Sequence, residues 1–447
     1  MTDCTTEPLL FSSLGSQKIQ ADFRGGQLTS DAGGLLLREV DKRLGLLDGL
    51  NSCITDPRDP DLITHTQRTL LAQRIFGIAL GYEDLNDHHG LRHDPLFQMV
   101  TERGVQDDQP LASSPTLCRL ENRVDRDSLA AMAAVLVDTF IDSFAQPPEE
   151  LILDVDATDD PVHGEQEKRF FHGYYDSYCF LPLYVFCGSQ LLCAYLRPSN
   201  IDGAYHSRAI VKLLVDRIRR AFPAVRIIVR SDSGFCRWKL LRWCDRHAVH
   251  YCIGLAQNSI LLQHAAQWMQ QAQRQFEQSG QPQRVFGPFD YAAGTWDRPR
   301  RVIAKAEHLA KGANPRFIVT NLPGDPQTLY EDLYCQRGDM ENRIKEQQLG
   351  LFADRTSCHA FVANQFRVLL SAAAYVLIET LRREGLADTE LATAQVSTLR
   401  VKLLKIGARV VRSVRRVVFH LAGGYPFKDL LRVVLARLRG RRPIPTG

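Results

Sequence analysis

Residues 151–158, which read LILDVDAT, decide the fold class of the chain. The aliphatic and β-branched residues are typical of a buried strand. Asp154 and Asp156 lie two positions apart, so their side chains share one face of that strand. A second such stretch, 226–234 (RIIVRSDSG), has Asp232 at its carboxyl end. These patterns predict a mixed α/β sheet in which two neighbouring strands end on acidic residues.

The intervening and following segments complete this sheet. We predict a hairpin from 180–189 and 191–198, helices at 205–222 and 237–248, and a short strand at 250–255. The segment 257–325 changes character: a Gln-rich helical stretch gives way to short strands, and we interpret it as a β-rich insertion. A long helix with a wide apolar face, 358–382, is expected to cover the sheet.

The first 147 residues are predicted to be mainly helical, with helices at 31–46, 66–79 and 128–144. Between them, 113–122 (SSPTLCRLEN) is typical of a capped helix start. Its Arg119 would suit contacts with DNA phosphates; an ordinary surface helix is the alternative. No apolar stretch of about 20 residues and no leader sequence is seen, so we expect no membrane helix and a cytoplasmic, nucleoid-associated protein.

Charge is distributed unevenly. Residues 397–442 hold 13 Lys or Arg and one acidic residue, Asp429, which gives this segment a charge of +12. The remainder has 42 basic and 50 acidic residues, and the whole chain carries +4. A basic segment on an acidic body favours a polyanionic partner, most simply double-stranded DNA. A small-molecule phosphohydrolase would leave this segment unexplained.

The stretch 334–350, YCQRGDMENRIKEQQLG, is predicted as a helix. Steps of 3, 4, 4 and 3 residues place five polar side chains on one stripe: Tyr334, Arg337, Glu341, Lys345 and Gln348. Taken alone, this stripe favours a solvated helix face with a Glu341–Lys345 pair.

The aspartates change that interpretation. Asp156 or Asp232 alone would be explained by capping of a turn. Two such carboxylates on adjacent strands repel each other unless a cation lies between them. With Glu341 they form an oxygen donor set suited to Mg²⁺, and two such ions promote phosphodiester displacement.

Seven segments carry a resemblance to a known family: GGLLLREVDKRLGL, GYEDLNDHHGLRHDP, LASSPTLCRLEN, LDVDATDDPVHGEQE, RSDSGF, YCIGLAQN and YCQRGDMENRIKE. The chain resembles bacterial insertion-sequence transposases of the DDE class, in the insertion-sequence 1380 family. The resemblance implies a ribonuclease-H-like catalytic core, a helical N-terminal DNA-binding region and a β-rich insertion. The implied domain bounds are 1–147, 148–256 (core), 257–325 (insertion), 326–385 (core) and 386–447 (basic C-terminal region).

The resemblance also implies roles for individual residues. Asp156, Asp232 and Glu341 would be catalytic and would hold two Mg²⁺ ions, for which Mn²⁺ is expected to substitute. The related signature Tyr-x2-Arg-x3-Glu-x6-Lys matches Tyr334 and Arg337 but has Gln348 at the last position.

Contacts with DNA are expected from Arg337, which would hold phosphate, and from Tyr334, which orients the same helix face. Lys345 would replace the missing lysine and also contact phosphate, and Trp296 would stack on a base. For Trp296, packing within the insertion is an equal alternative.

The predicted function is therefore DNA transposition. The protein would bind the terminal inverted repeats of its element as a dimer or larger assembly, cleave the ends and join them to target DNA. A metal nuclease of the same fold that does not join DNA, and an inactive DNA-binding relative, are the alternatives.

Overall fold

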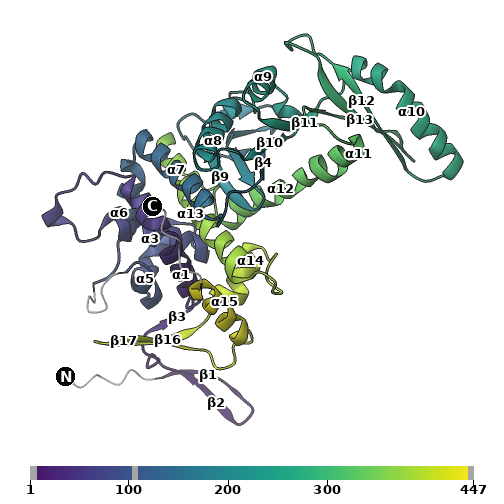
Figure 1. Ribbon diagram of the computed structural model, residues 1–447. Helices are drawn as coiled ribbons and strands as arrows, with labels where there is room; N and C mark the ends of the chain where they lie inside the picture. The colour runs from purple at the N-terminus through teal and green to yellow at the C-terminus, as the bar shows by residue number, and fades with distance from the viewer. Residues whose placement is uncertain (1–7, 103–108, 441–447) are drawn as a thin grey trace. The chain divides into compact units, whose positions relative to one another are not determined.

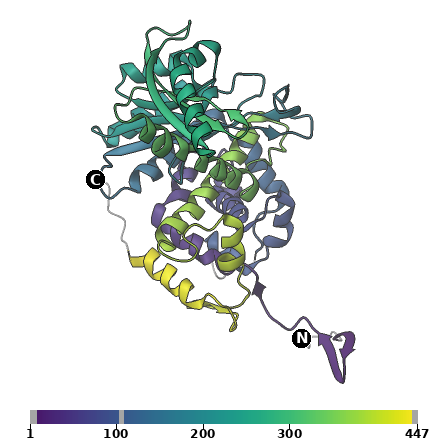
Figure 2. The same ribbon diagram turned by 90° about the vertical axis from the view of Figure 1, so that its right-hand side faces the viewer.

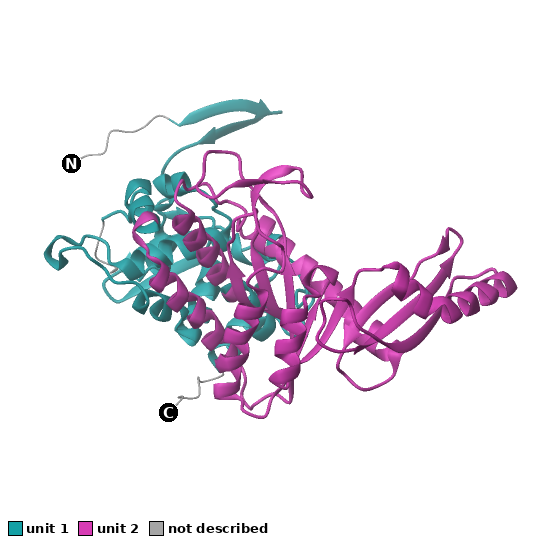
Figure 3. Ribbon diagram, turned by 90° about the horizontal axis from the view of Figure 1, so that it is seen from above, with its two compact units in different colours: residues 1–121, 377–447 teal, residues 122–376 magenta. Residues whose placement is uncertain are grey.

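The computed structural model describes residues 8–102 and 109–440. The chain forms two compact units (Figure 3): Met1–Glu121 with Leu377–Gly447, and Asn122–Val376. The segments at the two ends of the chain thus belong to the same unit. The five-part division expected from the sequence stays a prediction.

The second unit is built on a nine-stranded mixed sheet (Figure 1). β4, β10 and β11 are parallel, and the remaining strands pair in the antiparallel direction. The predicted α/β class and the adjacency of β4 and β10 are confirmed. The strand order is β12 (Gln283–Tyr291), β13 (Arg300–Leu309), β15 (Arg316–Thr320), β11 (His250–Leu255), β10 (Arg226–Ser231), β4 (Glu150–Ala157), β8 (Leu183–Cys187) and β9 (Gln190–Tyr195), with β14 (Gly312–Ala313) beside β13.

The strands of the predicted insertion extend this same sheet, because β15 pairs with β11. Helix α10 (Ser259–Ser279) packs along β12 and β13 (Figure 1). Gly287 of β12 makes this packing possible, since a Cβ atom there would lie 1.8 Å from the Trp268 indole. The insertion therefore continues the core sheet and covers one of its faces with its own helix.

The two faces of β4 have different roles. Leu151, Leu153 and Val155 join the apolar core with α8 (Ser207–Ala221) and α9 (Trp238–Arg246). The alternate positions, which include both aspartates, face the other way. On that side, Leu329 and Tyr330 form a second apolar cluster with sheet residues.

Helix α13 (Phe361–Thr380) continues in a π-helical turn to Gly385 and is almost wholly buried. It lies against the sheet through Tyr375, whose ring is 5.7 Å from that of Phe186. Among the described residues, this is the one helix whose length and composition would allow a membrane span, and 89% of its most apolar window is buried inside the protein. The predicted cover of the sheet is confirmed.

The first unit is mainly helical, as expected for its N-terminal part, whereas the helix predicted at 128–144 is α7 (Arg126–Asp142) of the second unit. The single helix predicted at 31–46 is interrupted at Gly45, whose φ of +64° favours glycine and separates α1 from α2. The unit's principal helices are α1 (Gly34–Leu44), α2 (Leu46–Ser52), α3 (Gln67–Leu80), α5 (Pro95–Val100), α6 (Ser114–Arg123) and α15 (Lys428–Gly440).

Three smaller sheets were not predicted in full. One of them contains β16 (Ala408–Ser413), which pairs with β17 (Arg416–Leu421) on one side and with β3 (Leu28–Thr29) on the other. This sheet therefore combines strands from the N-terminal and C-terminal parts of the chain. An N-terminal hairpin, purple in Figure 2, and a three-stranded sheet after β4 complete the set. Their strands are β1 (Leu9–Leu14), β2 (Gln17–Ala21), β5 (Asp160–Pro161), β6 (Phe170–His172) and β7 (Ser177–Phe180).

Candidate active site

Parallel pairing of β4 and β10 sets the positions of two candidate carboxylates. Asp154 is opposite Arg230 in the register, so Asp156 lies two residues further along β4 and Asp232 directly follows the end of β10. Asp232 accepts a hydrogen bond from the Gly234 amide at 2.9 Å, and Asp156 accepts one from the Ala157 amide at 2.8 Å. Both carboxylates therefore accept hydrogen bonds from local backbone amides. They lie at the edge of the sheet that is formed by the carboxyl ends of β4 and β10.

The segment that carries Glu341 is less regular than predicted. A π-helical turn, Leu329–Tyr334, is followed by a 3₁₀ turn, the α-helix α12 (Gly338–Lys345) and a second π-helical turn, Glu346–Gly350. The expectation of one uniform α-helix is thus wrong, because only Gly338–Lys345 has α-helical hydrogen bonding. Glu341, within the α-helical part, is exposed.

The three carboxylates interact electrostatically. The pKa of Asp156 is raised to about 6, mainly by burial and in addition by the negative charges of Asp232 and Glu341. The amide of Ala157 and the positive charge of Arg337 act in the opposite direction. The Arg337 guanidinium is 3.8 Å from the Asp156 carboxylate. The edge therefore carries an excess of negative charge that one arginine does not balance.

This donor set suits a divalent cation. Carboxylate oxygens are the ligands that Mg²⁺ prefers, and a cation would relieve the repulsion that raises the pKa of Asp156. Within residues 8–102 and 109–440, however, no three His, Cys, Asp or Glu side chains are gathered closely enough to hold one ion. The chemistry of the residues fits the metal, and binding would require these side chains to move together.

A buried ion pair, which sequence reasoning missed, joins the elements that carry the acids. Arg230 donates two hydrogen bonds to Asp154, at 2.5 and 2.7 Å, and a third to the Leu333 carbonyl at 2.6 Å. Both side chains are nearly inaccessible. Asp154 precedes Asp156 by two residues, and Arg230 precedes Asp232 by two. A charged residue at that offset in each apolar run was the available signal.

Tyr334 lies where β11 meets the helical segment. A Cβ atom on Gly254 would approach the Tyr334 hydroxyl to 2.6 Å and the Ser233 amide nitrogen to 2.8 Å. Glycine at 254 therefore allows the phenol to lie beside the loop of Asp232. Burial raises the pKa of Tyr334, and the guanidinium of Arg337 lies 6.0 Å from the centre of its ring.

Lys345 and Gln348 have different environments. Gln348 is half-buried and donates a hydrogen bond to the Asp159 carbonyl at 2.8 Å. Lys345 is exposed on α12, one turn beyond Glu341. The position of the signature lysine is thus used for an internal contact, and the neighbouring cation is open to solvent.

Trp296 is partly buried against the main apolar core. Its ring packs edge-to-face with Tyr291 at 5.5 Å, and the Arg300 guanidinium lies 5.4 Å from its centre. Arg300 is itself buried and paired with Asp245. These contacts are those of a packing residue, and a contact of Trp296 with a base stays a prediction.

In the first unit, Arg119 is exposed on α6, as a phosphate-binding residue would be. The same helix is held by Glu121, which forms a fully buried ion pair with Arg74 at 2.9 Å. His88 is buried and contacts Gln73 and Arg74. Contact of Arg119 with DNA stays a prediction.

Much of the basic C-terminal segment has internal partners. Arg400 donates to the carbonyls of Ala79 and Ile78 at the end of α3, and Lys405 pairs with Asp31 at 2.6 Å. Arg415 and Arg416 are exposed where β16 turns into β17, whereas Arg441 and Arg442 lie outside the described residues. The count of +12 therefore overstates the charge available to a polyanion.

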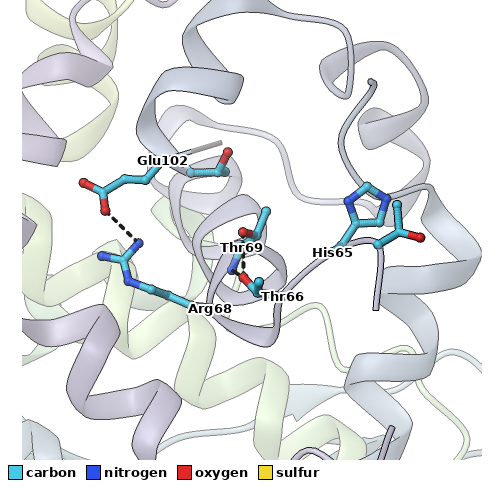
Figure 4. Close-up of a pocket in the computed structure, with 7 residues that line it drawn as sticks. His65, Thr66, Arg68, Thr69 and Glu102 are labelled. Atoms are coloured by element: carbon cyan, nitrogen blue, oxygen red, sulfur yellow. Dashed lines mark hydrogen bonds and ion pairs between the residues drawn. The ribbon is translucent and has the colours of Figure 1, made fainter. Parts of the chain in front are cut away.

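A cavity of about 350 Å³ lies at the start of α3 (Figure 4). Arg68 points into it, but its guanidinium contacts Glu102 at 3.5 Å and also pairs with Asp48. Thr66 caps the helix by accepting from the Thr69 amide. The cations of this cavity are already paired, and none of the predicted site residues lines it.

Comparison with known proteins identifies the family. A family model described as "Transposase DDE domain group 1" matches residues 11–443. The chain belongs to this transposase family. No curated protein matches the sequence. Among solved structures, the chain is similar to one titled "Cryo-EM structure of piggyBac transposase synaptic complex with hairpin DNA", with 11% identity, a TM-score of 0.40 and coverage of 84% of this chain and 80% of that one.

Proposed function

We propose that this protein is a DNA transposase that binds the terminal inverted repeats of its own insertion sequence, cleaves phosphodiesters at its ends and joins them to target DNA. One observation carries the proposal. The negative charges of Asp232 and Glu341 both act on the Asp156 carboxylate, in a chain that belongs to a DDE transposase family over nearly its whole length.

Asp156, Asp232 and Glu341 would hold two Mg²⁺ ions, or Mn²⁺ in their place. When bound, the ions would activate the attacking oxygen and stabilise the leaving one. Arg337 faces this edge and would hold a phosphate once Asp156 is engaged elsewhere. Tyr334 would support Arg337, and Lys345 would contact phosphate from the next turn of the helix.

The finer family placement and the assembly belong to the same proposal. The sheet would be a ribonuclease-H-like core, and the chain would belong to the insertion-sequence 1380 branch. Arg119 and the exposed Arg415 and Arg416 would contribute to binding of duplex DNA. A dimer or larger assembly would hold the paired ends, in the bacterial cytoplasm at the nucleoid.

The test uses purified full-length protein, Mg²⁺ and labelled DNA that carries the sequences flanking the gene. Wild type should produce cuts at the element ends and joined products, and Asp232→Asn should produce neither. Asp339→Asn, an exposed acid on the same helix as Glu341, is the matched control and should retain both activities. Full cleavage by Asp232→Asn would refute the proposal.

The joining step separates the proposal from its rivals. A metal nuclease of this fold would release cut ends that are never joined to target DNA. An inactive relative would bind end-bearing DNA but leave it intact at every Mg²⁺ concentration. Product lengths on a denaturing gel distinguish these three results in one experiment.

A further inference from the structure

The small sheet that follows β4 presents an unusual set of exposed aromatic side chains. We define the aromatic hairpin as residues 170–180, which comprise β6, β7 and the turn between them. Within it, Tyr174 is 85% exposed, Phe171 53% and Tyr178 49%. Large apolar rings are rarely left so open in a group unless they bind something.

The rings are arranged as a surface. Phe171 and Tyr178 are cross-strand partners, and their rings meet edge-to-face at 5.7 Å. The Arg169 guanidinium, which also pairs with the exposed Glu165, lies over Tyr178 at 4.7 Å. The two ring planes are inclined at 71°, so the rings and the arginine form a stepped platform on which flat ligands can stack at separate faces.

The turn of the hairpin approaches the carboxylates. Tyr174 and Tyr175 pack edge-to-face at 5.0 Å. Burial raises the pKa of Tyr175 to about 12, and the charges of Asp159 and Asp156 contribute to the shift. Strand β7 of the hairpin also pairs with β5, which begins four residues after Asp156. The hairpin is therefore attached directly to the strand that carries Asp156, and Tyr174 is exposed to solvent at its turn.

We propose that the aromatic hairpin stacks on unpaired DNA bases next to the phosphate to be cleaved. This inference rests on the proposed function and adds to it a site for single-stranded DNA. The faces of bases are available to aromatic rings only where the strand is unpaired, so the platform would discriminate unpaired DNA from duplex. Trp296, already packed against Tyr291 and Arg300, is less open to such a contact.

Binding without metal tests the site independently of cleavage. Full-length protein in EDTA is titrated, at fixed salt, into a single-stranded 20-mer containing 2-aminopurine and into the matching duplex. Tyr174→Ala, and the pair Phe171→Ala with Tyr178→Ala, should weaken single-strand binding by about tenfold or more. Duplex binding should change less than twofold, and the quenching of 2-aminopurine should be lost.

Two control variants test whether the effect is specific to a stacking ring in the aromatic hairpin. Tyr205→Ala removes a tyrosine that is 56% exposed elsewhere in the same unit, and it should bind both DNAs as wild type does. Tyr174→Trp keeps a stacking ring and should retain the quenching. Thermal melting of each variant verifies folding.

Three results would overturn the stacking site. These are equal losses for single strand and duplex, selective loss with Trp296→Ala but not with the hairpin variants, or a changed sedimentation coefficient, which would assign the surface to a second copy. Normal cleavage without single-strand selectivity would refute only this site. Selectivity in a protein that never cleaves would refute only the proposed function.

Discussion

Asp154 and Asp156 lie on the same strand and the same face, two residues apart, yet their surroundings are opposite. Asp154 is buried and receives two hydrogen bonds from Arg230. Asp156 has a guanidinium only at 3.8 Å and faces the charges of Asp232 and Glu341. The charge of Asp154 is neutralised by Arg230, and this closed pair links β4 to β10. The charge of Asp156 is not neutralised within the protein, and an un-neutralised carboxylate is what a cation-binding site requires.

The largest expected effect comes from breaking the closed pair. Arg230→Met leaves the Asp154 carboxylate buried without a partner and should lower the free energy of unfolding by about 3–5 kcal/mol. Urea denaturation measures the loss. Arg230→Met combined with Asp154→Leu should recover most of it, because no buried charge then remains. If the single variant costs less than about 1 kcal/mol, the pair does not hold the strands.

Substitution of Asp156 should have the opposite effect on the free energy of unfolding. Because the pKa of Asp156 in the folded protein is about 6, above its ordinary value of 3.8, ionisation at neutral pH destabilises the metal-free protein. Asp156→Asn should therefore raise the free energy of unfolding at pH 7.5 by about 1–3 kcal/mol. The gain should shrink as pH falls through 6 and vanish near 4.

Melting curves in EDTA between pH 4 and 8 measure this dependence. Asp339→Asn is the control for the loss of one exposed negative charge from the helix that carries Glu341. A gain for Asp156→Asn that is the same at every pH would contradict the excess of negative charge at this edge.

The helical segment that carries Glu341 shows the same contrast between a side chain with an internal partner and one that is exposed to solvent. Gln348 is engaged with the Asp159 carbonyl, so Gln348→Ala should cost about 1 kcal/mol of stability and little activity. Lys345 is open to solvent, and Lys345→Ala should lower the cleavage rate by about tenfold, the loss expected for one phosphate contact of about 1.4 kcal/mol. Single-turnover cleavage separates the two, and equal small effects would leave Lys345 without a role.

The sequence was sufficient to predict the two strands that carry Asp156 and Asp232. The apolar runs before Asp156 and Asp232 predicted neighbouring strands, because period-two alternation and strand-end acids depend on local sequence. The Arg230–Asp154 pair had a signal, a charged residue two positions before each acid, but its partners depend on strand register, which is set by tertiary packing. The π-helical turns before and after α12 were not predicted either.

The basic C-terminal segment shows why a count of charges does not predict a binding surface. Counting charges predicted a polyanion-binding tail, but a count does not tell which partners the charges have. Arg400 binds helix carbonyls and Lys405 binds Asp31, so part of the predicted surface is internal structure. A direct measurement tests the role of the three acids.

That measurement is a titration of Mn²⁺ into the metal-free full-length protein, followed by electron paramagnetic resonance. The account predicts saturable binding to wild type and to Asp339→Asn. It predicts binding at least about tenfold weaker in Asp156→Asn, Asp232→Asn and Glu341→Gln alike, because the three carboxylates act as one donor set. Unchanged Mn²⁺ affinity in all three variants would contradict it.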